Sequence, residues 1–220
     1  SVTYNNLVIN KVSGIALVNA ALTANGNLSV TAGELDMNAN ATIGGNIAIS
    51  SGATLYGDGA IINAGGNWSN SGTFNAGTGS VVINGTAAQS ISSTTFNNLS
   101  VNKSAGTATL SGNIIINSDL SVQSGTLDLA TYTSNRSAAG GQLNISGGAT
   151  LIAGGANNFP QNYAIQTAAT TSTVHYNGTV AQTVAGITYG NLIFSYGGAS
   201  AKTLNASSTV NGDITINIGS

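Results

Sequence analysis

The sequence predicts an all-β protein, a parallel β-helix (β-solenoid) with about 18–21 residues per coil. Three observations carry this prediction: a long internal repeat, a shorter period near 20 residues inside it, and alternation of apolar and polar side chains. No stretch keeps a helical period for long enough to indicate a helix.

The long repeat is about 92 residues. Residues 3–11 (TYNNLVINK) recur as residues 95–103 (TFNNLSVNK), and a third copy begins at residue 188 (TYGNLIF). The chain therefore divides into units 3–94, 95–187 and a truncated 188–220, and we expect residues 1–220 to form one continuous solenoid segment.

The shorter period sets the length of a coil. Gly26-Asn27-Leu28 recurs as Gly45-Asn46-Ile47 and Gly66-Asn67-Trp68, at spacings of 19 and 21 residues. This spacing predicts about five coils per long unit and about a dozen in all. At about 4.8 Å per coil the rod would be roughly 55 Å long.

Apolar residues alternate with hydroxyl residues inside each short repeat. Because successive side chains of a strand point to opposite faces, one set is expected in the core and the other outside. Leu28, Val30, Leu120 and Val122 are the expected core residues, with Ser29 and Ser121 outside. Residues 131–141 are interpreted as a loop that bulges from the second unit, since the repeat is four residues longer there.

Tandem β-sandwich domains are the alternative fold. Asn-Gly pairs begin at residues 25, 84, 177 and 211, and this dipeptide is typical of two-residue hairpins between antiparallel strands. The single proline, the few aromatic residues and the period near 20 favour the solenoid instead.

The composition argues against an electrostatic partner. Only 5% of the residues are charged, against roughly 25% in an ordinary soluble domain. Lys11, Lys103, Arg136 and Lys202 are the only cationic side chains besides one histidine, so we expect no nucleic-acid binding. There is no cysteine for a thiolate site, and no apolar run long enough for membrane insertion by a helix.

The residues that could carry chemistry are sparse. His175 is the only histidine, and it aligns with Val82 of the preceding unit, so we interpret it as an ordinary strand residue. Glu34 and Asp36 could share a face and bind a cation weakly, but Thr126 replaces Glu34 in the second unit.

A polysaccharide-cleaving site would need acidic and basic residues grouped on one face. The second unit offers Asp119, Asp128 and Arg136, with Lys103 as the nearest lysine in the sequence. Asp36 and Asp128 are repeat equivalents, which about five coils would separate by roughly 24 Å. We therefore predict that the protein is not an enzyme and has no catalytic residue, metal site or cofactor.

Paired asparagines begin the long units. Asn5-Asn6, Asn97-Asn98 and Asn191 are expected to form ladders in which side-chain amides on successive coils hydrogen-bond along the axis.

A family resemblance rests on these repeat motifs. Asn-Gly-Thr-x-x-Gln (residues 84–89 and 177–182), Thr-Tyr/Phe-x-Asn-Leu and Gly-Asn/Asp-Leu-x-Val resemble the repeats of large secreted surface proteins of bacteria, especially Bacteroidota. These are similar to filamentous-haemagglutinin-type adhesins and autotransporter passengers. The resemblance spans nearly the whole chain, and it implies a right-handed parallel β-helix at the extracellular cell surface that serves as a fibre, filament or adhesin stalk.

Two expectations on partners follow. Neither end carries an evident cap, since Ser1 and Ser220 both fall within repeat sequence, so homo-oligomers or head-to-tail filaments are expected. The alternative function is a carbohydrate-binding module of a surface adhesin, in which exposed aromatic rings stack on glycans. Its candidate residues are Tyr56, Trp68, Tyr132 and Tyr163.

Overall fold

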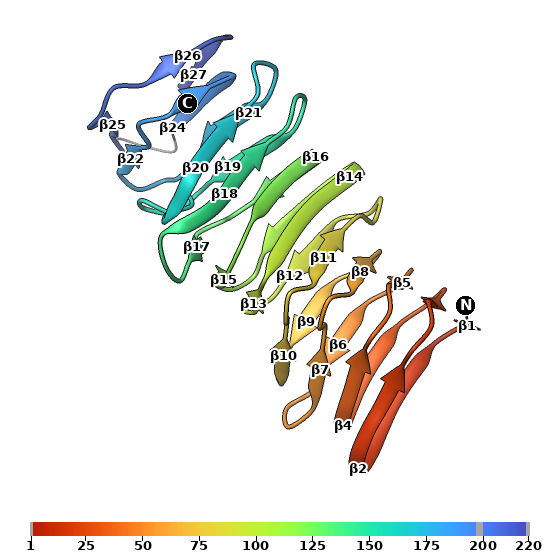
Figure 1. The fold of residues 1–220 in the computed structure, drawn as a ribbon. Coiled ribbons are helices and arrows are strands. Elements are labelled where there is room, and N and C mark those ends of the chain that lie inside the picture. Colours follow the sequence, from red (N-terminus) through yellow and green to blue (C-terminus); the bar gives the residue numbers. More distant parts are fainter. Residues whose placement is uncertain (1, 197–199, 219–220) are drawn as a thin grey trace.

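The computed structural model describes residues 2–196 and 200–218, and within them the chain is a β-solenoid (Figure 1). Every strand pairing in these ranges is parallel, and the strands stack in about 11 turns of roughly 20 residues. The solenoid prediction is confirmed, and the tandem β-sandwich is wrong. Residues 1, 197–199 and 219–220 lie outside the described residues, as do the parts of the predicted units that fall on them, Ser1 and Ser220 included.

Each turn contributes strands to three faces. Face 1 runs the length of the rod. It contains the first halves of β2 (Leu7–Val18) and β4 (Leu28–Met37) and the second halves of β14 (Asn98–Leu110) and β16 (Leu120–Asp128). Its other strands are β6 (Ile47–Ile49), β9 (Trp68–Asn70), β12 (Gln89–Ile91), β19 (Thr150–Ala153), β21 (Thr173–Tyr176), β24 (Asn191–Tyr196) and β27 (Ile214–Ile218).

The other two faces complete the turns. Face 2 contains the second halves of β2 and β4, then β7 (Thr54–Tyr56), β10 (Thr73–Asn75), β13 (Thr95–Phe96), β15 (Ile114–Ile116), β17 (Ser134–Arg136), β22 (Gln182–Val184) and β25 (Lys202–Leu204). Face 3 contains β1 (Val2–Tyr4), β3 (Leu22–Ala24), β5 (Ala41–Ile43), β8 (Ile61–Ala64), β11 (Ser80–Ile83), the first halves of β14 and β16, β18 (Gly140–Ile145), β20 (Tyr163–Ala168), β23 (Thr188–Tyr189) and β26 (Thr209–Val210).

The core is a continuous apolar column between the three faces. The inward assignments are confirmed, because the four predicted core residues are completely buried: Leu28, Val30, Leu120 and Val122. Ser29 and Ser121 point outward as predicted, but they are only half-exposed, since neighbouring turns cover part of each side chain.

Four long strands continue around a corner because a glycine bends them. Gly33 in β4 and Gly125 in β16 have φ angles of +74° and +73°, a left-handed conformation that other residues rarely adopt. A Cβ at Gly125 would also lie 2.8 Å from the carbonyl oxygen of Lys103 in the turn below. These bends join neighbouring faces through the backbone, so strands of all three faces share one 20-stranded sheet.

The long repeat does not contain a whole number of turns. Leu7 lies on face 1, its repeat equivalent Leu99 lies on face 3, and Leu192 returns to face 1. The expectation of about five coils per unit therefore needs correction, because the second copy is rotated by one face about the axis. Asp36 lies on face 2 while its equivalent Asp128 lies on face 1, so repeat equivalents do not line up along the rod.

The Asn-Gly pairs at residues 84 and 177 belong to an arch whose glutamine side chain is buried. In this glutamine arch, residues 84–89 or 177–182, the chain loops over and the glutamine side chain turns inward. Gln89 Oε1 accepts a hydrogen bond from Gly85 N at 2.8 Å, and Gln89 Nε2 donates to the carbonyl oxygen of Ala64 in the turn below at 2.9 Å. Gln182 repeats this with Gly178 and Ala153. The Asn-Gly dipeptide therefore lies at a corner of the solenoid, although the same dipeptide is also typical of a hairpin turn.

Residues 131–141 are not simply a loop. Ser134–Arg136 form β17, which pairs with β15 on face 2, and Ser134 is completely buried. Thr131 and residues 137–139 are exposed, and residues 137–139 form a short turn between β17 and β18.

A charge at an inward position should unfold the rod. Val122→Asp places an unpaired carboxylate in the apolar column, so we expect a loss of about 4 kcal/mol or more in the free energy of unfolding. Ser121→Asp, one residue away on the outer side, is the control and should change stability by less than about 1 kcal/mol. Urea denaturation followed by circular dichroism measures both, and equal effects of the two variants would contradict the inward assignment.

Candidate functional surfaces

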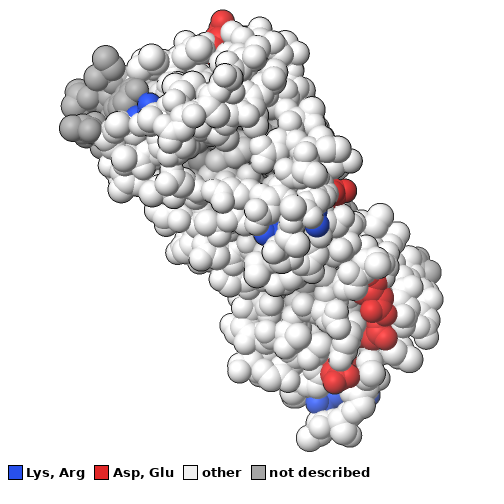
Figure 2. All heavy atoms as spheres, turned by 60° about the vertical axis from the view of Figure 1, so that its left-hand side comes forward, with Lys and Arg blue, Asp and Glu red and all other residues white. Residues whose placement is uncertain are grey.

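The outer surface carries few charges, and several of its acidic side chains lie close together on one stretch of the rod (Figure 2). In the described ranges, no three side chains among His, Asp and Glu gather closely enough to hold a metal ion. Each sequence-predicted candidate can therefore be considered separately.

Glu34 and Asp36 both lie on the outer side of β4, as the alternation predicts, and both are half-buried. Sequence reasoning missed Asp58, which follows β7 in the next turn and interacts with Asp36. Burial, followed by the negative charge of Asp58, raises the pKa of the Asp36 carboxyl above its ordinary value. Two carboxylates that repel each other are an incomplete ligand set for a cation.

His175 lies on the outer side of β21 between Ile152 and Ile193 of the adjacent turns. Its Nε2 atom is 2.7 Å from Ser195 Oγ, which is the distance expected of a hydrogen-bonded base and hydroxyl. A triad would need Asp128 to orient the imidazole, but Ile152 lies between the two on the ladder. Asp128 Oδ1 instead accepts a hydrogen bond from Ala130 N at 2.8 Å. The hydrogen bond therefore joins His175 to Ser195, but Asp128 does not complete a triad with them.

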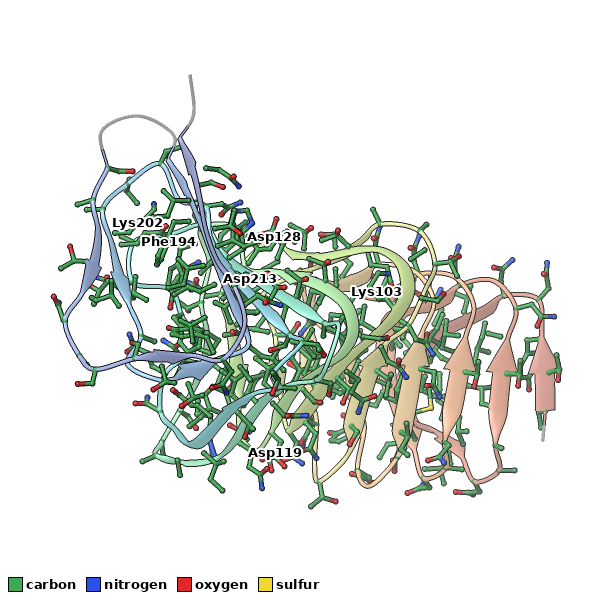
Figure 3. The ribbon with its side chains drawn as sticks, turned by 90° about the horizontal axis from the view of Figure 1, so that it is seen from above. Lys103, Asp119, Asp128, Phe194, Lys202 and Asp213 are labelled. Atoms are coloured by element: carbon green, nitrogen blue, oxygen red, sulfur yellow. The ribbon has the colours of Figure 1, made fainter. Side chains whose placement is uncertain are left out.

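Among the remaining candidates, Lys103 and Asp119 lie apart from each other (Figure 3). Asp119 Oδ1 accepts a hydrogen bond from Gln142 N at 2.8 Å, and Arg136 Nη2 donates to the carbonyl oxygen of Asn117 at 2.6 Å. Lys103 turns inward at the bend of β14 and is only 1% exposed. The charged groups are therefore engaged in holding adjacent turns together.

Asparagines do form ladders along the rod, with a geometry that differs from the expectation. In these ladders the side-chain oxygen of the asparagine accepts a hydrogen bond from a backbone N–H of the next turn. The expected amide-to-amide contacts occur elsewhere: Asn38 Nδ2 donates to Asn19 Oδ1 at 3.2 Å, and Asn84 Nδ2 donates to Asn63 Oδ1 at 3.3 Å. One ladder at 2.8 Å per step runs from Asn6 through Asn27, Asn46 and Asn67 to Ser90 N. Asn98 and Asn191 make the same contact to Asp119 N and Asp213 N. The hydrogen-bond partner of each ladder asparagine depends on the length of the turn between them, so the structure is needed to identify it.

The aromatic residues proposed to bind glycans are not an exposed platform. Trp68 and Tyr163 are buried, at 1% and 7% exposure, and Tyr56 and Tyr132 are half-buried. The Trp68 ring packs edge-on against Phe74, and its Nε1 donates to Thr94 Oγ1 at 3.1 Å. Tyr163 OH donates to the carbonyl oxygen of Ser134 at 2.9 Å. Trp68 and Tyr163 thus belong to the core.

An open depression of about 350 Å³ lies beside the turn that contains residues 157–161. It is lined by Asn157, Phe159, Pro160, Gln161, Gln166, Thr183 and Ala185. Its amides already have partners within the protein: Asn157 Oδ1 accepts from Thr183 N at 2.9 Å, and Gln166 Nε2 donates to the carbonyl oxygen of Pro160 at 3.3 Å. One atom of each of these two amides is therefore already engaged in holding the local structure.

Comparisons of this chain with protein-family models, with curated proteins and with solved structures find no match. None of the described segments forms a helix with the length and apolar character that a membrane crossing requires. The functional conclusion therefore depends on the geometry above.

The His175 pair should make stability depend on pH. Burial lowers the pKa of His175 below its ordinary value of about 6.5. The unfolded chain then takes up its proton at a higher pH than the folded chain, so stability is complete above about pH 6.5 and falls as the pH drops through the folded pKa. We expect His175→Gln to melt with a smaller difference between pH 7.5 and pH 5 than the wild type. An unchanged difference would show that His175 is equally solvated in both states.

The asparagine ladder predicts a matched pair of variants. Asn46→Ala removes the acceptor for Asn67 N, so it should cost about 1 kcal/mol. Asn46→Asp keeps an acceptor, as Asp119 does naturally toward Gln142 N, and should cost less. Thermal melts distinguish the two, and equal losses would mean that the side-chain oxygen contributes nothing.

Proposed function

We propose that this chain is a structural repeat segment of a secreted bacterial surface fibre, filament or adhesin stalk. The observation that carries the proposal is the unbroken ladder of parallel strands on face 1, which links β2 to β27 from one end of the described chain to the other. A ladder of this kind supports a rod whose length grows with the number of turns.

The mechanism of the proposed function is mechanical. Each interior turn is hydrogen-bonded to the turns above and below, and each buries several apolar side chains worth about 1.5–3 kcal/mol apiece. Because contacts are made only between neighbouring turns, adding a turn adds one interface without disturbing the others. The core runs in the same way from Leu22 to Phe194.

The outer surface supports a spacer role. It carries few charges, and hydrogen bonds within the protein engage Lys103, Asp119, Asp128 and His175. Glycan binding stays a prediction, but Trp68 and Tyr163 cannot supply its stacking surface while they are buried.

Both ends of the described rod leave apolar residues uncovered. Ile214 and Ile216 in β27 are 58% and 57% exposed, although their repeat equivalents Leu28 and Val30 are completely buried. Open strand edges of this kind favour pairing with further turns or with other copies. Pairing of such open edges with further turns or with other copies is therefore part of the proposal.

Labelling of cells tests the proposed location. Antibodies raised against the purified segment should bind intact cells of the source organism, and electron microscopy should place the label on thin projections that leave the surface. Labelling that appears only after the cells are lysed would contradict the proposal. An antibody to an abundant cytoplasmic protein is the control for lysis.

A further inference from the structure

A lysine ammonium caps each glutamine arch. Lys103 Nζ donates hydrogen bonds to the carbonyl oxygens of Gly85 and Ala87 and to Gln89 Oε1. Lys202 Nζ donates to the carbonyl oxygen of Gly178 in the second arch at 2.6 Å. The two lysines come from different positions of the long repeat, so the pairing of arch and ammonium occurs twice in different sequence contexts.

The turn that carries the first arch covers β14 completely. Residues 80–83 pair with residues 98–101, and residues 89–91 pair with residues 108–110, with the arch lying under the bend between them. As a result, the inward residues of β14 are buried to 2% exposure or less: Leu99, Val101, Lys103, Ala108 and Leu110.

Strand β2 is the repeat equivalent of β14, and its lower side is open. Lys11 corresponds to Lys103, and the bend beside it is the same, with φ angles of +74° at Gly14 and +71° at Gly106. Among the described residues, none accepts a hydrogen bond from Lys11 Nζ. The inward residues of β2, which we call the open face, are only half-buried: Leu7, Ile9, Lys11, Ala16 and Val18.

We propose that the open face is a docking surface for a solenoid turn with the sequence pattern of residues 80–94, paired in register with β2, and that Lys11 caps the Asn-Gly-Thr-x-x-Gln arch of that turn. The apolar residues of the open face match the underside of β14 position for position. The ammonium of Lys11 supplies the specificity, since a buried lysine is tolerated only where several oxygen acceptors surround it.

A second copy of this segment fits the open face less well. Its exposed C-terminal turn contains β25, β26 and β27, and residues 200–218 include no glutamine to build an arch. Both arches within a copy are already capped by Lys103 and Lys202. Stacking a second copy would therefore bury the Lys11 ammonium without its acceptors. The proposal goes beyond the stalk function because it names the chemistry of the covering turn.

An extended chain tests the proposal. Residues 80–94 are placed directly before Thr3, which reproduces the natural junction with Thr95. We expect the melting temperature to rise by about 4 °C or more. Acetylation of Lys11 by acetic anhydride, followed by mass spectrometry, should slow by about tenfold or more, as a mainly closed site requires. Lys103 is the buried internal reference.

Two variants separate the capping contact from simple coverage. Lys11→Met should cancel much of the gain in the extended chain and leave the original chain nearly unchanged, because no described residue accepts a hydrogen bond from Lys11 Nζ there. Replacing the glutamine of the added arch with alanine should act in the same way as Lys11→Met in the extended chain.

Three outcomes would overturn the proposal. They are an extension that stays disordered on an otherwise intact rod, a full gain in stability that survives Lys11→Met, and protection of Lys11 in the original chain that grows with protein concentration. The last outcome would assign the open face to a second copy. None of these results depends on where the protein is located in the cell, so they can be distinguished from failure of the proposed function.

Discussion

The structure depends on hydrogen bonding between parallel turns along the rod axis. Each strand donates and accepts main-chain hydrogen bonds with the strands directly above and below it, so a turn is satisfied only when both of its neighbours are present. The ladders of Asn6 to Ser90 extend this pairing to the corners, where side-chain oxygens accept from backbone N–H groups that the strands leave free. The low charge is compatible with the same constraint, because stacked like charges would repel along every column.

The fold was predictable because two independent sequence patterns indicate it. Alternation identifies Leu28 and Val30 as inward residues, and the spacing of Gly-Asn pairs gives the length of a turn. The phase of the long repeat could not be obtained in this way, since turn lengths vary and small differences accumulate. Over one repeat they rotate the chain by a whole face, which is why Leu7 and Leu99 occupy different ladders.

The individual contacts were harder to predict than the fold. Asn84-Gly85 fits a hairpin turn locally, and only the inward rotation of Gln89 across to the turn below reveals an arch. Asp58 and Ser195 were missed because each meets its partner through the stacking of turns, at a distance in sequence set by the loops. Trp68 is a candidate for glycan stacking only under the alternative function, and it is buried as its alignment with the inward Leu28 and Ile47 indicates.

The first turn differs from its repeat equivalent on the outside as well. Val8, Val12, Ile15 and Leu17 are exposed at positions where the second unit has serine or threonine. Apolar residues therefore lie on both the inner and the outer side of this turn, whereas β14 presents hydroxyl groups at the same outer positions. The end of the rod thus has a different surface chemistry from its middle.

Amide hydrogen exchange along the chain tests the nearest-neighbour account most directly. If each turn is held only by the turns above and below, protection should be greatest in the central strands β9 to β16 and decline gradually toward β2 and β27. Protection that instead rises and falls together within residues 3–94 and separately within residues 95–187 would show that the long repeats unfold as independent domains, which would contradict the account of a continuous rod.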